Sequence, residues 1–118
     1  MKPRTRYWKQ IRLLLDECVP ACLRKALLSH VVTTVGEAGW SGIKNGKLLA
    51  LAAASFDAFV TVDKNLPCQQ NAASLPITVL VLDAVSNELT YLLPIVPALE
   101  RELSNLMPRR YVLVRTEA

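Results

Sequence analysis

The sequence predicts a three-layer α/β fold in which helices cover both faces of a parallel sheet. Short apolar runs of strand length alternate along the chain with segments of helical pattern, as is typical of parallel sheets connected by right-handed crossovers. The runs are apolar at nearly every position, as expected for strands buried on both faces. With 118 residues, of which 52% are hydrophobic and 20% charged, the chain is long enough for one such domain.

The first strand is predicted within Ile11–Glu17, an apolar run that ends in Asp16 and Glu17. In parallel sheets, ligands bind beyond the carboxyl ends of the strands, so acids at this position face a site rather than the core. A helix is predicted over Pro20–Leu28, because proline is favoured in the first helical turn. The alternative for Asp16 is that it only caps this helix, as aspartate often does.

The second strand is predicted at Val31–Val35, which is rich in β-branched residues. His30 precedes it and should lie at the opposite end of the sheet from the acids, where a structural role is expected. The Gly-rich segment 36–42 follows the strand and carries Glu37, which should lie at the same edge as Asp16. Its glycines do not match a phosphate-binding fingerprint.

A helix that is apolar almost all round is predicted at Lys47–Ser55 and should be largely buried. Asn45 lies before it, as a turn residue or an N-cap. The third strand is predicted at Phe59–Val62 and ends in Asp63. Two strands that end in acid at one edge of a sheet would bring Asp16 and Asp63 within reach of one cation.

The fourth strand is predicted at Ile77–Leu82 and also ends in an acid, Asp83. The helical pattern of Asn87–Leu103 contains two prolines, which predict a kink or two shorter helices. Tyr111–Val114 is predicted to be the last strand, at an edge of the sheet.

The net charge of +4 is concentrated at the N-terminus. The first twelve residues contain five basic residues and no acidic one, whereas the rest of the chain has nine basic and ten acidic residues. We therefore distinguish a basic arm, residues 1–10, from a domain at 11–118. The arm also carries Tyr7 and Trp8, so it could contact phosphates and stack on a base. The alternative is a solvated, frayed terminus.

The sequence disfavours membrane-spanning, secreted and zinc-binding proteins. No apolar stretch reaches the roughly 18 residues of a membrane span, and no signal-peptide pattern follows the basic N-terminus. A cytoplasmic protein with no membrane partner is expected. Cys18, Cys22 and Cys68 are odd in number and lack the further pair that a zinc site needs, so reduced cysteines serving as small apolar residues are expected.

Three segments together resemble the small bacterial PIN-like proteins, a branch of the PIN superfamily often suspected to be toxins of toxin–antitoxin pairs. They are Asp16-Glu17 with Pro20 after the first strand, a GWSG-type loop after the second, and the run VTVDKN at 60–65 after the third. The resemblance covers residues 11–82. It implies a Rossmann-like, mainly parallel sheet in the order 3-2-1-4-5 and a ribonuclease dependent on Mg²⁺ or Mn²⁺.

The resemblance also implies roles for individual residues. Asp16 and Asp63 match the metal-binding acids, and Thr61 matches the supporting hydroxyl of the T-x-D motif. Asn45 and Asn65 stand where relatives commonly have acids. Glu17 and Glu37 are the nearby acids that could substitute, with Glu37 as the third catalytic candidate and Glu17 as a supporting one.

The two asparagines bear on the chemistry. Metal-dependent hydrolysis of a phosphodiester needs oxygen ligands that hold the ion and balance its charge. Amides keep the oxygens but remove about two negative charges, so metal affinity should fall. Mg²⁺ can be bound through one or two carboxylates plus a substrate phosphate, so activity is weakened rather than excluded.

The leading hypothesis is a PIN-like metal-dependent ribonuclease, the toxin-like member of a two-gene pair. Its expected partners are RNA, a small helix-turn-helix antitoxin and a second copy of the chain. The second hypothesis is a degenerate PIN-like module that binds RNA or a protein without cleavage. The third is a phosphoacceptor receiver domain, which would need a lysine after the last strand where this chain has Arg115. RNA contacts are expected at Lys44, Lys47, Lys64, Arg4 and Arg6.

Overall fold

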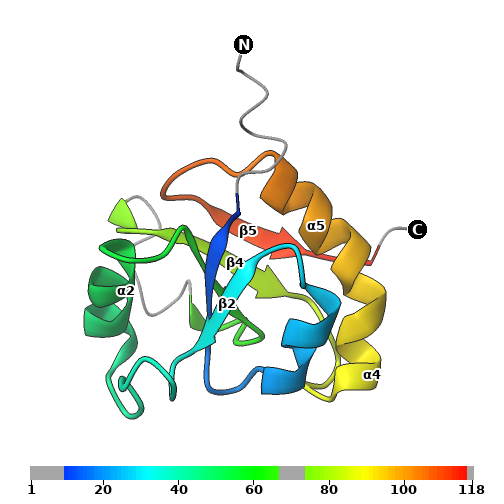
Figure 1. Cartoon of the computed structure of the whole chain (residues 1–118), viewed down its shortest axis with the longest axis horizontal. Coiled ribbons are helices and arrows are strands. Elements are labelled where there is room, and N and C mark those ends of the chain that lie inside the picture. The colour runs from blue at the N-terminus through cyan, green and yellow to red at the C-terminus, as the bar shows by residue number, and fades with distance from the viewer. Residues whose placement is uncertain (1–9, 67–73, 117–118) are drawn as a thin grey trace.

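The computed structural model describes residues 10–66 and 74–116 (Figure 1). Its centre is a five-stranded sheet in which every neighbouring pair of strands is parallel. The predicted α/β class with a parallel sheet is therefore confirmed. The strands are β1 Arg12–Leu15, β2 Val31–Thr34, β3 Ala58–Thr61, β4 Thr78–Leu82 and β5 Tyr111–Val114.

The strand order is β2-β1-β3-β4-β5, so the predicted order 3-2-1-4-5 is wrong. The predicted order would place the third strand at an edge, yet every residue of β3 has an exposed fraction of 0%. Such burial requires a paired strand on each side, and β1 and β4 provide them. β2, which carries the exposed Val31, forms the edge beyond β1.

Helices cover both faces of the sheet and complete the three predicted layers (Figure 1). Successive side chains of a strand point to opposite faces. Leu13 and Leu15 accordingly pack with the helices of one face, whereas Leu14 and Phe59 pack against α2 on the other. The covering elements are the 3-10 helices η1 Ala21–Ala26 and η3 Leu93–Ile95 and the α-helices α2 Asn45–Ala53, α4 Leu89–Leu92 and α5 Val96–Ser104.

The helix predicted at Pro20–Leu28 is shorter than expected and has 3-10 geometry, as η1. Pro20 is extended, with φ −63° and ψ 134°, and precedes the helix instead of occupying its first turn. No side chain caps this end, and the N–H of Leu27 bonds the carbonyl of Arg24, three residues back. The poorer hydrogen-bond geometry of 3-10 helices keeps them short.

The helix predicted at Lys47–Ser55 is found as α2, which begins earlier, at Asn45. Asn45 is thus the first helical residue rather than a turn residue or an N-cap. The expectation that this helix is largely buried is wrong, because only one face of it is buried. The buried residues are Leu48, Leu49 and Ala52. The exposed positions include alanines, which favour helices through their backbone propensity and do not require burial.

Prolines divide the last helical segment into shorter helices, as predicted. Pro94 lies in η3 and Pro97 in α5, each within the first two residues of its element. A proline there removes no helical hydrogen bond, because the first N–H groups of a helix have no partner within it. β5 follows as an edge strand, also as predicted. Across 10–66 and 74–116, no helix has the length and apolar character to cross a membrane.

Candidate functional site

The acids that follow β1 and β3 lie at a switch point of the sheet topology. The chain leaves β1 for β2 on one side and later returns to β3 on its other side. Doubly wound sheets bind ligands in the crevice beyond the strand ends at such a point, and flavodoxin-like and receiver domains share this strand order. Asp16 follows β1 directly, and its N–H bonds the carbonyl of Val60 in β3 at 2.9 Å, which fixes its backbone.

Thr61 links the two acidic residues. It is the last residue of β3 and has an exposed fraction of 0%. Its Oγ1 donates to Oδ2 of Asp16 at 2.8 Å and accepts the N–H of Asp63 at 3.0 Å. One buried hydroxyl therefore holds both the side chain of Asp16 and the backbone of Asp63. The structure brings these three predicted site residues together.

Both carboxylates also accept backbone N–H groups. Oδ1 of Asp16 accepts from Glu17 at 2.8 Å, and Oδ1 of Asp63 accepts from the exposed Asn65 at 2.9 Å. These bonds orient the carboxylates and leave acceptor capacity, since each carboxylate has about four lone-pair sites.

The donor set at this point limits the kind of metal that fits. Within the described parts of the chain, no three His, Cys, Asp or Glu side chains are grouped so as to hold a metal ion. Asp16 and Asp63 offer hard carboxylate oxygens, which suit Mg²⁺ and Mn²⁺. Mg²⁺ keeps several waters and can bind through one or two carboxylates plus a substrate phosphate, so two carboxylates are sufficient in number for such a hydrated ion.

Cys18 is a further side chain at this point, although the sequence suggests only an apolar role for it. Its Sγ lies 3.5 Å from Oδ2 of Asp16 and 3.4 Å from Oγ1 of Thr61. Burial raises the pKa of the Cys18 thiol, which therefore stays protonated at neutral pH and can donate a weak hydrogen bond to the carboxylate. The only signal for this contact in the sequence is its position two residues after Asp16.

Glu37 is held in a contact of its own loop. Its Oε1 accepts the N–H of Thr34 at 2.9 Å, and its own N–H donates to Oγ1 of Thr34 at 3.0 Å. Nη2 of Arg24 lies 2.7 Å from the same Oε1. The Thr34 N–H and then the Arg24 guanidinium lower the pKa of Glu37. The structure therefore places Glu37 with Thr34 and Arg24 instead of joining it to Asp16 or Asp63.

Replacing Glu37 with glutamine is expected to lower the melting temperature slightly at pH 7. Glutamine keeps an oxygen for the Thr34 N–H but loses the ion pair with Arg24. Because the pKa of Glu37 is lowered in the fold, its stabilising effect is fully present above its ordinary value of 4.5 and is lost as the pH falls through the folded value. Thermal melts of both proteins should therefore converge once the pH falls below the folded pKa of Glu37, which lies under its ordinary value of 4.5. A difference that is the same at all pH values would contradict a role for the charge.

Three other predicted site residues lie in or beside the start of α2. Lys44 precedes the helix, Asn45 is its first residue, and Lys47 follows in the first turn. Both lysines are exposed, and Asn45 is partly buried. Glu17 is exposed and accepts the N–H of Gly42 at 3.4 Å, so it connects the Gly-rich loop to the end of β1.

Lys64 and Arg115 both pair with Asp83, the acid that follows β4. Nζ of Lys64 lies 2.8 Å from Oδ1 of Asp83, and Nε of Arg115 lies 3.0 Å from Oδ2. The hydrogen bond from Lys64, followed by the charges of Lys64 and Arg115, lowers the pKa of Asp83. These three residues are called the strand-end cluster below. Arg115 occupies the position where a receiver domain needs a lysine, and it pairs with Asp83.

His30 precedes β2 at the opposite end of that strand from the acids, as expected. Its Nε2 lies 2.7 Å from Oε1 of Glu100 in α5, and its Nδ1 is buried without a hydrogen-bond partner in the described parts of the chain. The contact connects the edge of the sheet to α5, which agrees with a structural role.

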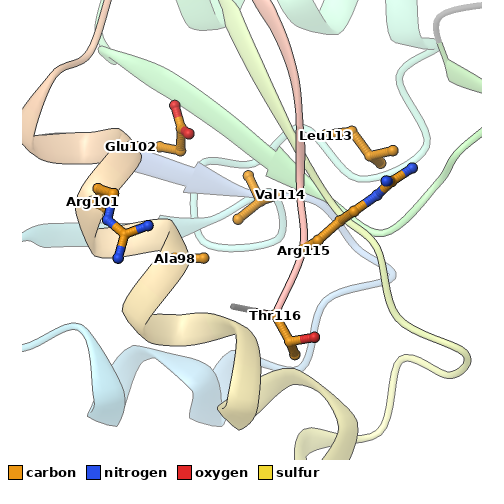
Figure 2. Close-up of a pocket in the computed structure, with 7 residues that line it drawn as sticks. All are labelled: Ala98, Arg101, Glu102, Leu113, Val114, Arg115 and Thr116. Carbon is orange, nitrogen blue, oxygen red and sulfur yellow. The ribbon is translucent and has the colours of Figure 1, made fainter. Parts of the chain in front are cut away.

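An open cavity of about 510 Å³ lies between α5 and the end of β5 (Figure 2). It is lined by Ala98, Arg101 and Glu102 of α5 and by residues 113–116. Figure 2 shows Arg115 leaving the strand on the same side as Leu113, away from Val114 and Arg101. Arg115 therefore contributes to the lining of this cavity while its Nε pairs with Asp83.

The candidate site therefore consists of Asp16, Thr61, Asp63 and Cys18. The strand-end cluster is adjacent to it in the sequence, because Lys64 directly follows Asp63 and pairs with Asp83. The predicted RNA contacts Arg4 and Arg6 lie outside the described residues, as do Tyr7, Trp8 and Cys68.

No protein-family model matches this chain, and no curated protein or solved structure matches it significantly.

Proposed function

We propose that the protein is a PIN-like, metal-dependent ribonuclease that acts at the carboxyl ends of β1 and β3. The observation that carries this proposal is the Thr61 hydroxyl, which bonds the Asp16 carboxylate at 2.8 Å and the Asp63 N–H at 3.0 Å. Two acids from different strands are thereby held at one point of the edge where doubly wound sheets bind ligands. The same residues carry the resemblance to PIN-like proteins.

Asp16 and Asp63 would hold Mg²⁺ or Mn²⁺, with water completing the coordination. When bound, such an ion neutralises charge on a phosphate and lowers the pKa of its water. The residues of the chain orient the ligands: Thr61 and the Glu17 N–H restrain Asp16, and the Asn65 N–H restrains Asp63. The protonated thiol of Cys18 covers one side of the Asp16 carboxylate.

RNA is the proposed substrate, because basic side chains lie around an edge that carries acids. Lys44 and Lys47 are exposed at the start of α2 and can neutralise backbone phosphates. A small helix-turn-helix antitoxin, a second copy of the chain and a cytoplasmic location remain predictions from the sequence.

A second candidate function is RNA or protein binding without cleavage. The observation in its favour is that the two carboxylates already accept hydrogen bonds from within the protein. Glu37, which could have supplied a third acid, is bonded to Arg24 and Thr34. A site with two carboxylates and amides at Asn45 and Asn65 balances less of the charge of a divalent ion than a four-acid site would.

RNA cleavage in the presence of Mn²⁺ distinguishes the two candidates. The protein is incubated with end-labelled single-stranded RNA and Mn²⁺, Mg²⁺ or EDTA, and the products are separated by size. We expect cleavage with Mn²⁺ that EDTA abolishes. RNA binding without cleavage at any metal concentration would favour the second candidate, and a protein that neither binds nor cleaves RNA would contradict both RNA-directed functions.

A further inference from the structure

We propose that the strand-end cluster is a clamp for a backbone phosphate of single-stranded RNA, with Asp83 as the residue that positions its two cations. The choice of RNA as the ligand rests on the proposed function, whereas the geometry of the cluster does not. Nothing in the PIN-like resemblance assigns a role to Asp83 or Arg115.

The cluster gathers two positive charges from separate segments around one carboxylate. Lys64 comes from the turn after β3 and lies 2.8 Å from Oδ1 of Asp83, while Arg115 follows β5 and lies 3.0 Å from Oδ2. The carboxylate balances only one of the two charges. The cluster itself therefore keeps a net charge of about +1, and its Lys64 directly follows Asp63 in the sequence.

Both cations keep hydrogen-bond donors for a ligand. The ammonium of Lys64 uses one N–H for Asp83 and one for the carbonyl of Ala84 at 3.0 Å, out of the three it carries. Arg115 bonds Asp83 through Nε, so in the described part of the chain its two terminal nitrogens are not engaged by Asp83. The side chains of Lys64 and Arg115 are 47% and 69% exposed, which leaves these donors accessible.

A phosphate group is the ligand that this arrangement fits. Its oxygens accept hydrogen bonds from the terminal N–H groups of a guanidinium and from an ammonium, and such charge-assisted bonds are strong. Because Asp83 already restrains both long side chains, less side-chain entropy is lost when a phosphate binds. A phosphate held here would place the RNA chain beside Asp63, so the clamp would bind a nucleotide next to the one at the acids.

The clamp can be tested without metal or cleavage by measuring how a short labelled single-stranded RNA binds in EDTA. Fluorescence anisotropy gives the affinity over a range of salt concentrations. Lys64→Gln and Arg115→Gln should each weaken binding at least about threefold and reduce the salt slope by about 0.7, the value for one phosphate contact on a single strand. Arg101→Gln is the matched control, because Arg101 belongs to α5 and lies across the cavity from Arg115 (Figure 2). It should change affinity less than either cluster variant.

The variant Asp83→Asn tests whether loss of the Asp83 carboxylate tightens or weakens RNA binding. By charge alone, removal of a carboxylate should tighten RNA binding, as expected for the control Asp57→Asn, which breaks the ion pair with Arg12 at the other end of the sheet. If Asp83 positions the two cations, Asp83→Asn should instead weaken binding about threefold or more, by loss of the preorganised donors. Thermal melts of each variant confirm that the binding measurements are made on folded protein.

Each outcome bears on the clamp separately from the proposed function. Tighter RNA binding by Asp83→Asn, or wild-type binding by both Lys64→Gln and Arg115→Gln, would overturn the clamp even if Mn²⁺-dependent cleavage is observed. Complete competition by a mononucleotide at equal ionic strength would also overturn it in favour of a free phosphate ester as ligand. Weaker binding by all three variants in EDTA supports the clamp even if no cleavage is found. If cleavage occurs, the same variants should raise KM more than they lower kcat.

Discussion

Asp16→Asn is expected to abolish divalent-cation binding and RNA cleavage while the protein stays folded. The substitution removes one of the two carboxylates at the switch point, at the residue that Thr61 and Cys18 contact. Loss of a group that merely supports a metal ligand already costs roughly 10–100-fold in affinity or activity, so loss of a ligand should exceed about 100-fold. Mn²⁺ titration calorimetry and the cleavage assay measure these two effects.

Asp57→Asn is the matched control for Asp16→Asn. It makes the same chemical change at the other end of the sheet, where Asp57 pairs with Arg12 at 3.3 Å. The control should bind Mn²⁺ as the wild type does and cleave saturating RNA at the wild-type rate. Wild-type cleavage by Asp16→Asn would place the catalytic site elsewhere in the molecule.

Asp16→Asn should lower the stability of the fold by about 1 kcal/mol. The single amide oxygen of an asparagine at position 16 can accept from the Glu17 N–H but cannot also accept from the Thr61 hydroxyl in the same orientation.

Thr61→Val is expected to destabilise the protein and weaken metal binding together. Valine has nearly the same shape as threonine, but it leaves Oδ2 of Asp16 without its strongest donor and the N–H of Asp63 without its acceptor. A buried polar group without a partner costs about 1–3 kcal/mol. Because Asp16 and Asp63 lose the group that holds them together, Mn²⁺ affinity should also fall by roughly 10–100-fold.

Thr61→Ser separates the hydroxyl from the packing of the side chain. Serine keeps the hydroxyl and loses one methyl group, which should cost about 1 kcal/mol and leave Mn²⁺ affinity near the wild-type value. Chemical denaturation and calorimetry on both variants measure the comparison. Equal Mn²⁺ affinities for Thr61→Val and Thr61→Ser would show that the hydroxyl does not organise a metal site.

The central strands β3 and β4 could be predicted from the sequence because burial on both faces leaves a nearly uninterrupted apolar run, whereas the half-buried β2 could be predicted from its β-branched residues. Tyr111–Val114 is found with its predicted bounds, and the prolines correctly divide the helical segment before it. The order of the strands could not be predicted in the same way, since an apolar run does not identify its neighbours. The burial of β3 between two strands becomes visible only in three dimensions.

The acids of the candidate site could be placed because all strands of a parallel sheet end at one edge. That rule correctly brings Asp16 near Thr61 and Asp63. It does not reveal which basic side chains pair with the other acids at this edge. Glu37 is bonded to Arg24 of η1, and Asp83 is bonded to Arg115 because β5 is the neighbour of β4. Both contacts depend on distances that local patterns do not contain.

The all-parallel sheet also governs how the site comes into existence during folding. The strand pairs join distant parts of the chain: Leu13 is paired with Ala58, and Val79 with Tyr111. The entropy of closing such loops must be overcome before the pairing contributes any stability, so sheets of this kind form slowly. A nascent chain that has not yet reached residue 58 contains Asp16 but lacks Thr61 and Asp63, and the side of β1 that will pair with β3 is still open. Chemistry that requires both strands is therefore unavailable to a partly synthesised chain.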